Sequence, residues 1–563
     1  MKQKILECVP NFSEGKNEEI INKIVNTIKT SNGVTLLDVD PGKDTNRTVV
    51  TFVGEPEAVI EAAFKLIQKT TELINMEHHK GEHPRMGATD VCPLIPISGI
   101  SMKEAVEYSI RLAKKVSNEL DVPTYLYEYS ATEKYRKNLA DIRIGEYEGL
   151  KNKLKDSKWQ PDFGPKEFNK IKKSGATAIG ARDFLIAYNI NLNTTSTRRA
   201  NAIAFDIREK GRIARKNDQL TGEILKDNNG NTIWKPGSLQ HVKAIGWYIE
   251  EYGITQISMN LTNIKKTPIH KVFDEVCKKA NARGIRVTGS ELVGLIPLKS
   301  MIDAGKYFLH KQQRSTGIAE SEVIKIAQKT MGLDEIQNFD PQDKIIEYKI
   351  QKVEKKLCDL SLSHFLQETA SESPAPGGGS ISAYIGALGA SLTTMVANLS
   401  SHKRGWDKKW EEFSFLAEKG QLYIKELEHL VDADTKAFNS ILAAFRLSEK
   451  NEQEKKIKMK EIEMATLKAI EIPLKIMQES LQLMKLIDTL VEKGNPNSIS
   501  DVGVAALCAR SAVIGGYLNV LINIKDYNNT RNKKKLLKEA EDIKEQAIKQ
   551  ENIIIKKTLK KIR

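Results

Sequence analysis

The sequence has few cysteines and few aromatic side chains, and it begins without a long apolar run. Its five cysteines lie far apart, and no two of them form a CxxC pair. This spacing supports neither a disulfide framework nor a cysteine zinc site, and it is typical of reduced thiols in a reducing compartment. Aromatic residues make up 6% of the chain, which leaves little material for stacking on nucleic-acid bases. We therefore expect a cytoplasmic protein that binds no nucleic acid.

Long apolar segments are scarce as well. The segment Met1–Glu7 does not resemble a signal peptide. The run Ile381–Leu399 is apolar, but it contains serine, threonine, asparagine and several small residues. That composition favours a closely packed helix in a soluble protein over a membrane span.

The chain has 563 residues and a formal net charge of +14. This length predicts three or four folding units. A basic surface suits a polyanionic substrate, although much of the excess comes from lysines on helix faces that we expect to be solvated.

Hydrophobic periodicity divides the chain into two halves of different class. Residues 1–182 alternate β-rich runs with helical patterns, which predicts an α/β subdomain with helices packed on a sheet. Residues 183–330 show the order β-α-β-β-α-β, which predicts a second, ferredoxin-like subdomain. Residues 331–356 read as a charged linker that contributes one strand, Ile345–Ile350. Residues 357–563 are almost entirely helical, which predicts an all-α bundle of four to six helices.

The densest cluster of chemically active side chains is His78–Gly87, followed by Asp90. It holds three histidines, a lysine, an arginine and two carboxylates within thirteen residues. A histidine there would titrate near neutral pH, and its neighbours could fix its tautomer. His79 and His83 have the spacing of a metal-binding pair, but a glycine and a proline in the segment disfavour the continuous helix that such a pair requires. We expect no metal.

A second polar set follows the ends of predicted strands, where open α/β sheets hold ligands. Taken one at a time these are ordinary turn residues. The set consists of Asn11, Glu14, Asp38, Asp40 and Asn46–Arg47.

Three features of the helical half carry polar groups. The segment Pro376–Ser380 leads into a helix, and exposed amides at a helix start form an anion site, although a plain linker would look the same. Val431–Asp434 places two carboxylates two residues apart, so one can face the bundle interior and have its pKa raised. Two exposed acids are the alternative. Ser500–Asp501 forms a helix cap.

Longer motifs resemble known families. The first half resembles the formiminotransferase family, and the second half resembles the cyclodeaminase/cyclohydrolase family. Their order along nearly the whole chain is similar to that of the fused formiminotransferase-cyclodeaminase family. The motifs of the first half are Glu7–Gly15, Gly81–Gly87, Asp162–Pro165, Gly175–Thr177, Gly180–Arg182 and Gly289–Pro297, and those of the second are Pro374–Ser380, Val431–Asp434 and Ser500–Ala505.

This resemblance implies two consecutive reactions. The formimino group of N-formimino-L-glutamate passes to N5 of tetrahydrofolate, and 5-formiminotetrahydrofolate then cyclises to 5,10-methenyltetrahydrofolate with release of ammonia. By motif position, His83 is the expected catalytic residue of the transferase, and Asp434 that of the cyclodeaminase. Polyglutamylated tetrahydrofolate is the implied carrier, without metal or nucleotide. A homo-oligomer without nucleic-acid or membrane partners is also implied.

The resemblance further implies a set of substrate- and folate-binding positions. The basic balance of the chain fits the polyglutamate tail of a folate. The positions are Asn11, Asp40, Arg47, Arg85, Gly164, Pro165, Gly175, Gly377, Gly378, Ser380 and Asp501.

Two other functions of the helical half stay open from the sequence. It could act as a methenyltetrahydrofolate cyclohydrolase, because that activity shares the family. It could also be a non-catalytic assembly domain, in which case Asp434→Ala would leave every activity intact.

Overall fold

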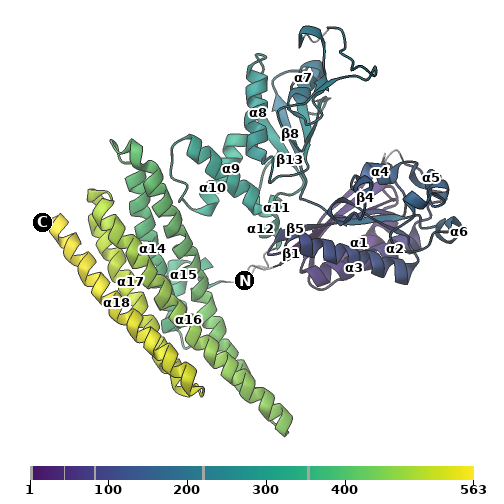
Figure 1. Ribbon diagram of the computed structural model, residues 1–563. Coiled ribbons are helices and arrows are strands. Elements are labelled where there is room, and N and C mark those ends of the chain that lie inside the picture. Colours follow the sequence, from purple (N-terminus) through teal and green to yellow (C-terminus); the bar gives the residue numbers. More distant parts are fainter. Residues whose placement is uncertain (1–3, 44, 82–83, 219–221, 351–355, 374) are drawn as a thin grey trace. The chain divides into compact units, whose positions relative to one another are not determined.

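The computed structural model describes residues 4–43, 45–81, 84–218, 222–350, 356–373 and 375–563. The chain divides into two compact units (Figure 1). The first comprises Met1–Ala304 and Gln328–Lys352, and the second comprises Gly305–Ala327 and Val353–Arg563. The second unit thus includes a stretch that the boundary predicted at residue 330 assigns to the ferredoxin-like subdomain.

The first subdomain is a seven-stranded sheet covered by helices (Figure 1). Its strand order is β1-β4-β2-β5-β7-β6, with β3 paired to β4, and the pairs β5–β7 and β6–β7 are parallel. The elements are β1 (Ile5–Cys8), β2 (Asn11–Phe12), α1 (Glu18–Lys29), β3 (Val34–Gly42), β4 (Arg47–Gly54), α2 (Pro56–Leu73), β5 (Thr89–Ser98), α3 (Met102–Leu120), β6 (Thr124–Leu126), α4 (Leu139–Arg143), α5 (Glu146–Lys153), α6 (Phe168–Ile171) and β7 (Thr177–Ala181).

The predicted α/β class is confirmed, and the β-rich runs and helical patterns of residues 1–182 are present as strands and helices. Sequence patterns missed β7, although all five of its residues are buried. The strand consists of threonine, isoleucine, two alanines and a glycine, so only two of its residues favour strands. Its position beside the start of β5 nevertheless shapes the functional edge of the sheet.

The second subdomain confirms the order β-α-β-β-α-β. It is a four-stranded antiparallel sheet with order β11-β12-β8-β13. A two-stranded ribbon, β9 and β10, lies in sequence between α7 and β11. The elements are β8 (Ile186–Leu192), α7 (Thr197–Ile207), β9 (Arg212–Ile213), β10 (Trp234–Lys235), β11 (Val242–Ile249), β12 (Ile254–Leu261), α8 (Ile269–Asn281) and β13 (Val287–Val293).

The strand predicted at Ile345–Ile350 is wrong. Ile345 forms a single bridge to Ile296, and the chain then continues as helix α12 (Ile346–Ile350). Six residues are too few for the apolar pattern to distinguish the two periods. The helical form is stabilised because Glu347 accepts a hydrogen bond from the backbone of Leu298 at 2.7 Å. The neighbouring helices are α9 (Leu298–Lys311), α10 (Glu320–Met331) and α11 (Pro341–Lys344).

The helical half is a bundle, as predicted (Figure 1). Its helices are α13 (Leu362–Thr369), α14 (Gly378–Ser401), α15 (Trp410–Phe445), α16 (Glu452–Lys493), α17 (Ile499–Asn523) and α18 (Thr530–Ile562). Small residues bring α14 and α17 together, and a Cβ on Gly389 would lie 3.1 Å from both Cys508 Cβ and the carbonyl oxygen of Ala505.

Two segments of the bundle are long and apolar enough to cross a membrane, by length and composition alone. In Gly378–Ser401, 61% of the apolar window is buried within the structure, and in Pro496–Asp526 the share is 39%. Core helices of water-soluble bundles pass the same test, so these properties are weak evidence for a membrane span.

Glu7, in β1, gives the first subdomain a pH-dependent stability. Its side chain is buried, and this burial raises the pKa of the carboxyl to about 7, against the opposing effect of Arg182. The folded protein therefore holds this proton more tightly than the unfolded chain does. The corresponding stability, about 3 kcal/mol, is fully present below pH 4.5 and is lost as the pH rises through about 7.

We predict that Glu7→Gln flattens this pH dependence. Calorimetry between pH 5 and 8 should show the Tm of the first subdomain falling less with pH in Glu7→Gln than in the wild type. The exposed Glu107→Gln on α3 is the matched control and should follow the wild type. Parallel curves for all three proteins would contradict the buried, protonated carboxyl.

Candidate active site

Several residues predicted to bind substrate lie at one end of the strands of the seven-stranded sheet, where β2 and β3 end and β4 and β5 begin. We call this end the functional edge. Gly87 bridges Gly175, so the segments that precede the parallel strands β5 and β7 are neighbours. Strand β2 lies between β4 and β5, with Asn11 opposite both Val49 and Val91. Asp40 is also opposite Val49. The edge therefore combines the end of β2, the β3–β4 hairpin and the loop before β5.

Arg85 holds the loop before β5 in place, and it is almost fully buried. Its terminal nitrogens contact Glu146 at 2.8 Å and Glu148 at 2.7 Å, both at the start of α5. Its Nε donates to Nδ1 of His79 at 3.3 Å. Because both terminal nitrogens are bound to carboxylates, Arg85 orients the loop and presents no unpaired charge to a substrate.

His79 faces the β3–β4 hairpin from this loop. Its Nε2 lies 2.9 Å from the carbonyl oxygen of Asn46, and burial lowers the pKa of its imidazole. The Asn46 side chain accepts from the amide of Gly15 at 3.0 Å and donates to the carbonyl of Lys80 at 2.8 Å. One asparagine thus joins three loops at the edge. Glu82 and His83 lie outside the described residues.

Arg47, at the start of β4, adds a partly buried guanidinium to this region. Its Nε is buried without a hydrogen-bond partner among the residues that the structure describes, and burial lowers the pKa of its guanidinium. Nearby Asp90 is already engaged, because it accepts from the amide of Met86 at 3.0 Å and pairs with Arg143. A buried donor without a partner is costly, and a substrate carboxylate would satisfy it.

The predicted glycine positions divide into two places. A Cβ on Gly175 would lie 2.2 Å from the carbonyl oxygen of Met86, and its φ is +67°. This position therefore needs glycine, and it presses the Arg85 loop against β7. Gly164 lies instead beside the segment that leads into β6, where an added Cβ would be 3.0 Å from the carbonyl oxygen of Val122. The preceding residue, Phe163, bridges Thr124 of β6, and Pro165 follows Gly164 in the sequence.

The second candidate site lies at the start of α14. Asp434, on α15, has Oδ2 at 3.2 Å from Ser380 Oγ, and Ser380 is fully buried. Ser380 also donates to the carbonyl of Val431 at 2.8 Å. Burial raises the pKa of the Asp434 carboxyl, although hydrogen bonds from Ser380 oppose the shift. A Cβ on Gly379 would lie 2.2 Å from Asp434 Oδ1, so the carboxyl rests directly on glycine backbone.

Helix α17 contributes to this site with its C-terminal end. The Asn519 side chain lies next to Gly378, with its Nδ2 3.2 Å from an added Cβ, and Gly377 caps α14 beside it. Asp501 lies in the first turn of the same helix, about 27 Å along the axis at 1.5 Å per residue. Within one chain, Asp501 therefore does not join the Asp434 cluster, and its role in binding stays a prediction.

Comparison with known proteins agrees with the division of the chain into two halves. The family descriptions that match are "Formiminotransferase domain, N-terminal subdomain" over residues 5–182, "Formiminotransferase domain" over 187–351 and "Formiminotransferase-cyclodeaminase" over 361–542. The formimidoyltransferase-cyclodeaminase of Mus musculus is 41% identical over 93% of each chain. The chain belongs to the formimidoyltransferase-cyclodeaminase family. It is an enzyme with transferase and cyclodeaminase activities.

Some relatives match only one half of this chain. The glutamate formimidoyltransferase of Streptococcus pyogenes is 41% identical over 54% of this chain and 93% of its own. The methenyltetrahydrofolate cyclohydrolase of Methylorubrum extorquens is 32% identical over 32% of this chain and 88% of its own. Each half of this chain is thus similar to an enzyme that occurs separately.

Sequence reasoning missed the partners that position the predicted residues in this family member. Arg143, Glu146 and Glu148 come from short helices that carry no strong periodicity. Gly145 was the one sequence signal of a turn there. In the structure both Gly145 and Glu146 have positive φ, at 86° and 53°. A glycine followed by alternating glutamates indicates a sharp turn with clustered charge, but not which cation it meets.

We predict that Gly379→Ala lowers the rate of the cyclodeaminase step by about 100-fold and leaves the transferase step intact. The added methyl group cannot fit 2.2 Å from Asp434 Oδ1, so the carboxyl must move, and a displacement of about 1 Å costs on the order of 100-fold in rate. Ammonia release from supplied 5-formiminotetrahydrofolate measures the effect. Gly149→Ala is the control, because its Cβ meets nothing within 4 Å. Equal ammonia release by both variants would contradict the placement of Asp434.

We predict that Arg85→Lys lowers the transferase rate by about 10-fold or more, because lysine cannot bridge two carboxylates and a histidine. The cyclodeaminase rate should not change. Arg111→Lys, at an exposed pair with Glu57, controls for the loss of an arginine. A transferase rate within twofold of the wild type would show that the loop does not need Arg85.

Proposed function

We propose that this protein transfers the formimino group of N-formimino-L-glutamate to N5 of tetrahydrofolate and then cyclises the product to 5,10-methenyltetrahydrofolate. The observation that carries the proposal is the pairing of a raised-pKa carboxyl, Asp434, with the amide end of α14, in a chain that aligns with both enzymes of its family. Histidine degradation and one-carbon metabolism are the processes that this pair of reactions would serve.

In the transfer step, N5 of tetrahydrofolate attacks the formimino carbon and the bond to the glutamate nitrogen breaks. His83 would take the proton from N5 and give it to the departing nitrogen. The described flanks of His83 support this assignment, because Arg85 and Asn46 hold its loop against the sheet edge. The unpartnered Nε of Arg47 would bind a carboxylate of the donor.

In the cyclisation step, N10 attacks the amidine carbon and the bond to the terminal nitrogen breaks, releasing ammonia. The leaving nitrogen needs two protons to become ammonia: N10 gives up its own proton to it, and Asp434 would supply the other. Burial of its carboxyl, which raises the pKa, keeps this group protonated at higher pH than an exposed aspartate. Asn519 and the first amides of α14 would orient the folate. Both steps only move protons and make and break carbon–nitrogen bonds, so we propose that neither a metal nor a nucleotide takes part.

We further propose that the natural carrier is polyglutamylated tetrahydrofolate and that the enzyme is a cytoplasmic homo-oligomer. The net charge of +14 supports the first point, because a basic protein attracts a polyanionic tail. Titration should therefore give tighter binding of the pentaglutamate than of the monoglutamate form, with the difference shrinking at high salt. Equal affinities at low salt would count against the polyglutamate carrier.

A cyclohydrolase is the second candidate function of the helical half. The similarity to the cyclohydrolase of Methylorubrum extorquens supports it. The two reactions differ in the leaving group, because a cyclohydrolase acts on the methenyl carbon with water and releases no ammonia.

One assay separates these functions. The purified protein is given N-formimino-L-glutamate and tetrahydrofolate, and the absorbance of methenyltetrahydrofolate is followed together with ammonia. Equal amounts of both products are expected. Transfer of the formimino group without ammonia would show that the helical half is not a cyclodeaminase.

We predict that His83→Asn lowers the rate of the transfer step by about 100-fold or more, because asparagine is polar but cannot take up and release a proton near neutral pH. Ammonia release from supplied 5-formiminotetrahydrofolate should be unchanged. His78→Asn, in the same loop with an exposed side chain, is the control. If His78→Asn is the inactive variant instead, the catalytic histidine has been misassigned.

A further inference from the structure

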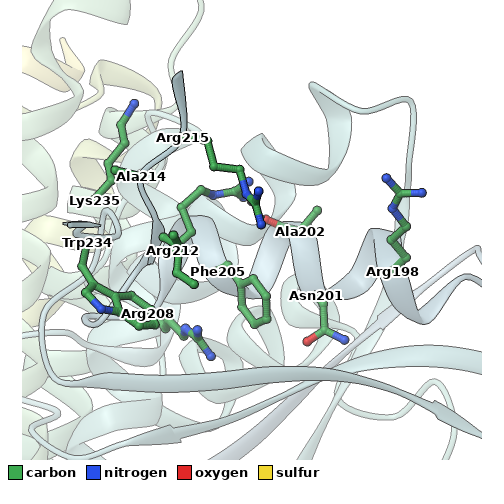
Figure 2. A pocket seen from close by; sticks show the side chains of 11 residues that line it. Arg198, Asn201, Ala202, Phe205, Arg208, Arg212, Ala214, Arg215, Trp234 and Lys235 are labelled. Carbon is green, nitrogen blue, oxygen red and sulfur yellow. Dashed lines mark hydrogen bonds between the residues drawn. The ribbon is translucent and has the colours of Figure 1, made fainter. Parts of the chain in front are cut away.

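A pocket of about 310 Å³ lies in the second subdomain, away from every residue assigned above (Figure 2). It is formed between the outer face of α7 and the β9–β10 ribbon. Helix α7 packs on the sheet with Ala200, Ile203, Ala204 and Ile207, so its opposite face lines the pocket. The lining consists of Arg198, Asn201, Ala202, Phe205, Arg208, Arg212, Ile213, Ala214, Arg215, Trp234 and Lys235.

The charge of this pocket is of one sign. Five of the lining residues are cationic, and none of the described lining residues is a carboxylate. Arg212 pairs with Asp206, which lies behind the wall. By contrast, Arg198, Arg208 and Arg215 have no carboxylate within ion-pair distance in the described part of the chain. Burial, and after it the positive charge of Arg212, lower the pKa of the Arg208 guanidinium.

The walls between these cations are apolar and partly aromatic. The Arg208 guanidinium lies over the Phe205 ring at 3.9 Å, and the ammonium of Lys210 lies over the Trp234 ring at 4.2 Å. Figure 2 shows the arginine side chains arranged around Phe205. Arginine in such a setting can bind phosphate or carboxylate oxygens in pairs while its flat face stacks on a ring.

Hydrogen bonds within the protein fix the walls of the pocket before any ligand binds. Asn201 exchanges two hydrogen bonds with the backbone of Gly246, at 2.8 and 3.0 Å, which fixes α7 to β11. Arg212 also donates to the carbonyl of Ala202 at 2.6 Å. At the base of the ribbon, a Cβ on Gly237 would lie 2.1 Å from the carbonyl oxygen of Arg208. Walls fixed in this way lower the entropy cost of binding.

We propose that this pocket is a second ligand site, which binds a small organic polyanion carrying a planar ring. The cations recognise its phosphate or carboxylate groups, and Phe205, Ile213 and Trp234 contact its ring. The site is independent of the two reaction centres, because its lining contains none of their residues. Two sources supply this ligand chemistry, a nucleotide and an aromatic oligocarboxylate such as the tail half of a folate.

Calorimetric titration of the full-length protein with ADP and with p-aminobenzoyl-triglutamate tests the site and separates the sources. At least one of the two should bind, and Arg198→Ala combined with Arg215→Ala should weaken that binding 10-fold or more. Arg199→Ala, the neighbouring exposed arginine that does not line the pocket, should leave it unchanged. Arg198→Ala alone, at an exposed position that folding does not need, should weaken it by a smaller factor. Adenosine and pyrophosphate should each bind more weakly than ADP if the nucleotide is the ligand.

Three results would overturn the proposal. The first is that neither probe binds the wild type. The second is binding that survives the double substitution, which would place the probe at the folate sites. The third is pyrophosphate binding as tightly as ADP with no binding of the second probe, which would leave a purely electrostatic patch. Because no turnover is measured, these results leave the proposed reactions untouched.

Discussion

Both candidate reaction centres depend on one constraint, a close approach of the backbone that only glycine permits. At Gly175 the chain comes so near to the carbonyl of Met86 that a methyl group would lie 2.2 Å away. At Gly379 the same distance separates an added methyl group from the Asp434 carboxyl. The first contact presses the histidine-bearing loop against the sheet, and the second seats an acid on the start of a helix. Without these contacts the polar groups would return to water, and their pKa values to ordinary ones.

The two centres treat buried charge differently. In the transferase half, the charge of Arg85 is neutralised by Glu146 and Glu148. Arg85 also donates a hydrogen bond to His79, so it positions the loop before β5. Arg47 keeps a buried Nε without a partner among the residues that the structure describes, and we propose that it binds a carboxylate of the substrate. In the cyclodeaminase half, no cation among the described residues contributes to the pKa of the Asp434 carboxyl, so burial dominates and raises that pKa. We therefore expect Arg47 to bind an anion, because its Nε has no partner among the described residues. We expect Asp434 to donate a proton, because burial raises the pKa of its carboxyl.

The sequence predicted the fold class and most elements because periodic apolar patterns survive in long helices and in strands rich in branched residues. It failed at Ile345–Ile350, where six residues cannot distinguish the two periods, and at β7, whose alanines and glycine have no strand preference. Motif position located Asp434 and Ser380, and the structure places them 3.2 Å apart. It could not find Glu146 and Glu148, because a partner 61 residues away leaves no mark in local sequence. Nor could it show that Asp501 and Asn519 lie at opposite ends of one helix.

The central claim is that one chain holds two separable centres, each carrying one reaction. The most direct measurement mixes two inactive proteins, one with His83→Asn and the other with Asp434→Asn, and supplies N-formimino-L-glutamate and tetrahydrofolate. We predict that the mixture regains methenyltetrahydrofolate formation with matching ammonia, because the intermediate made by the second protein can be cyclised by the first. A mixture as inactive as its components, with both proteins folded, would contradict it.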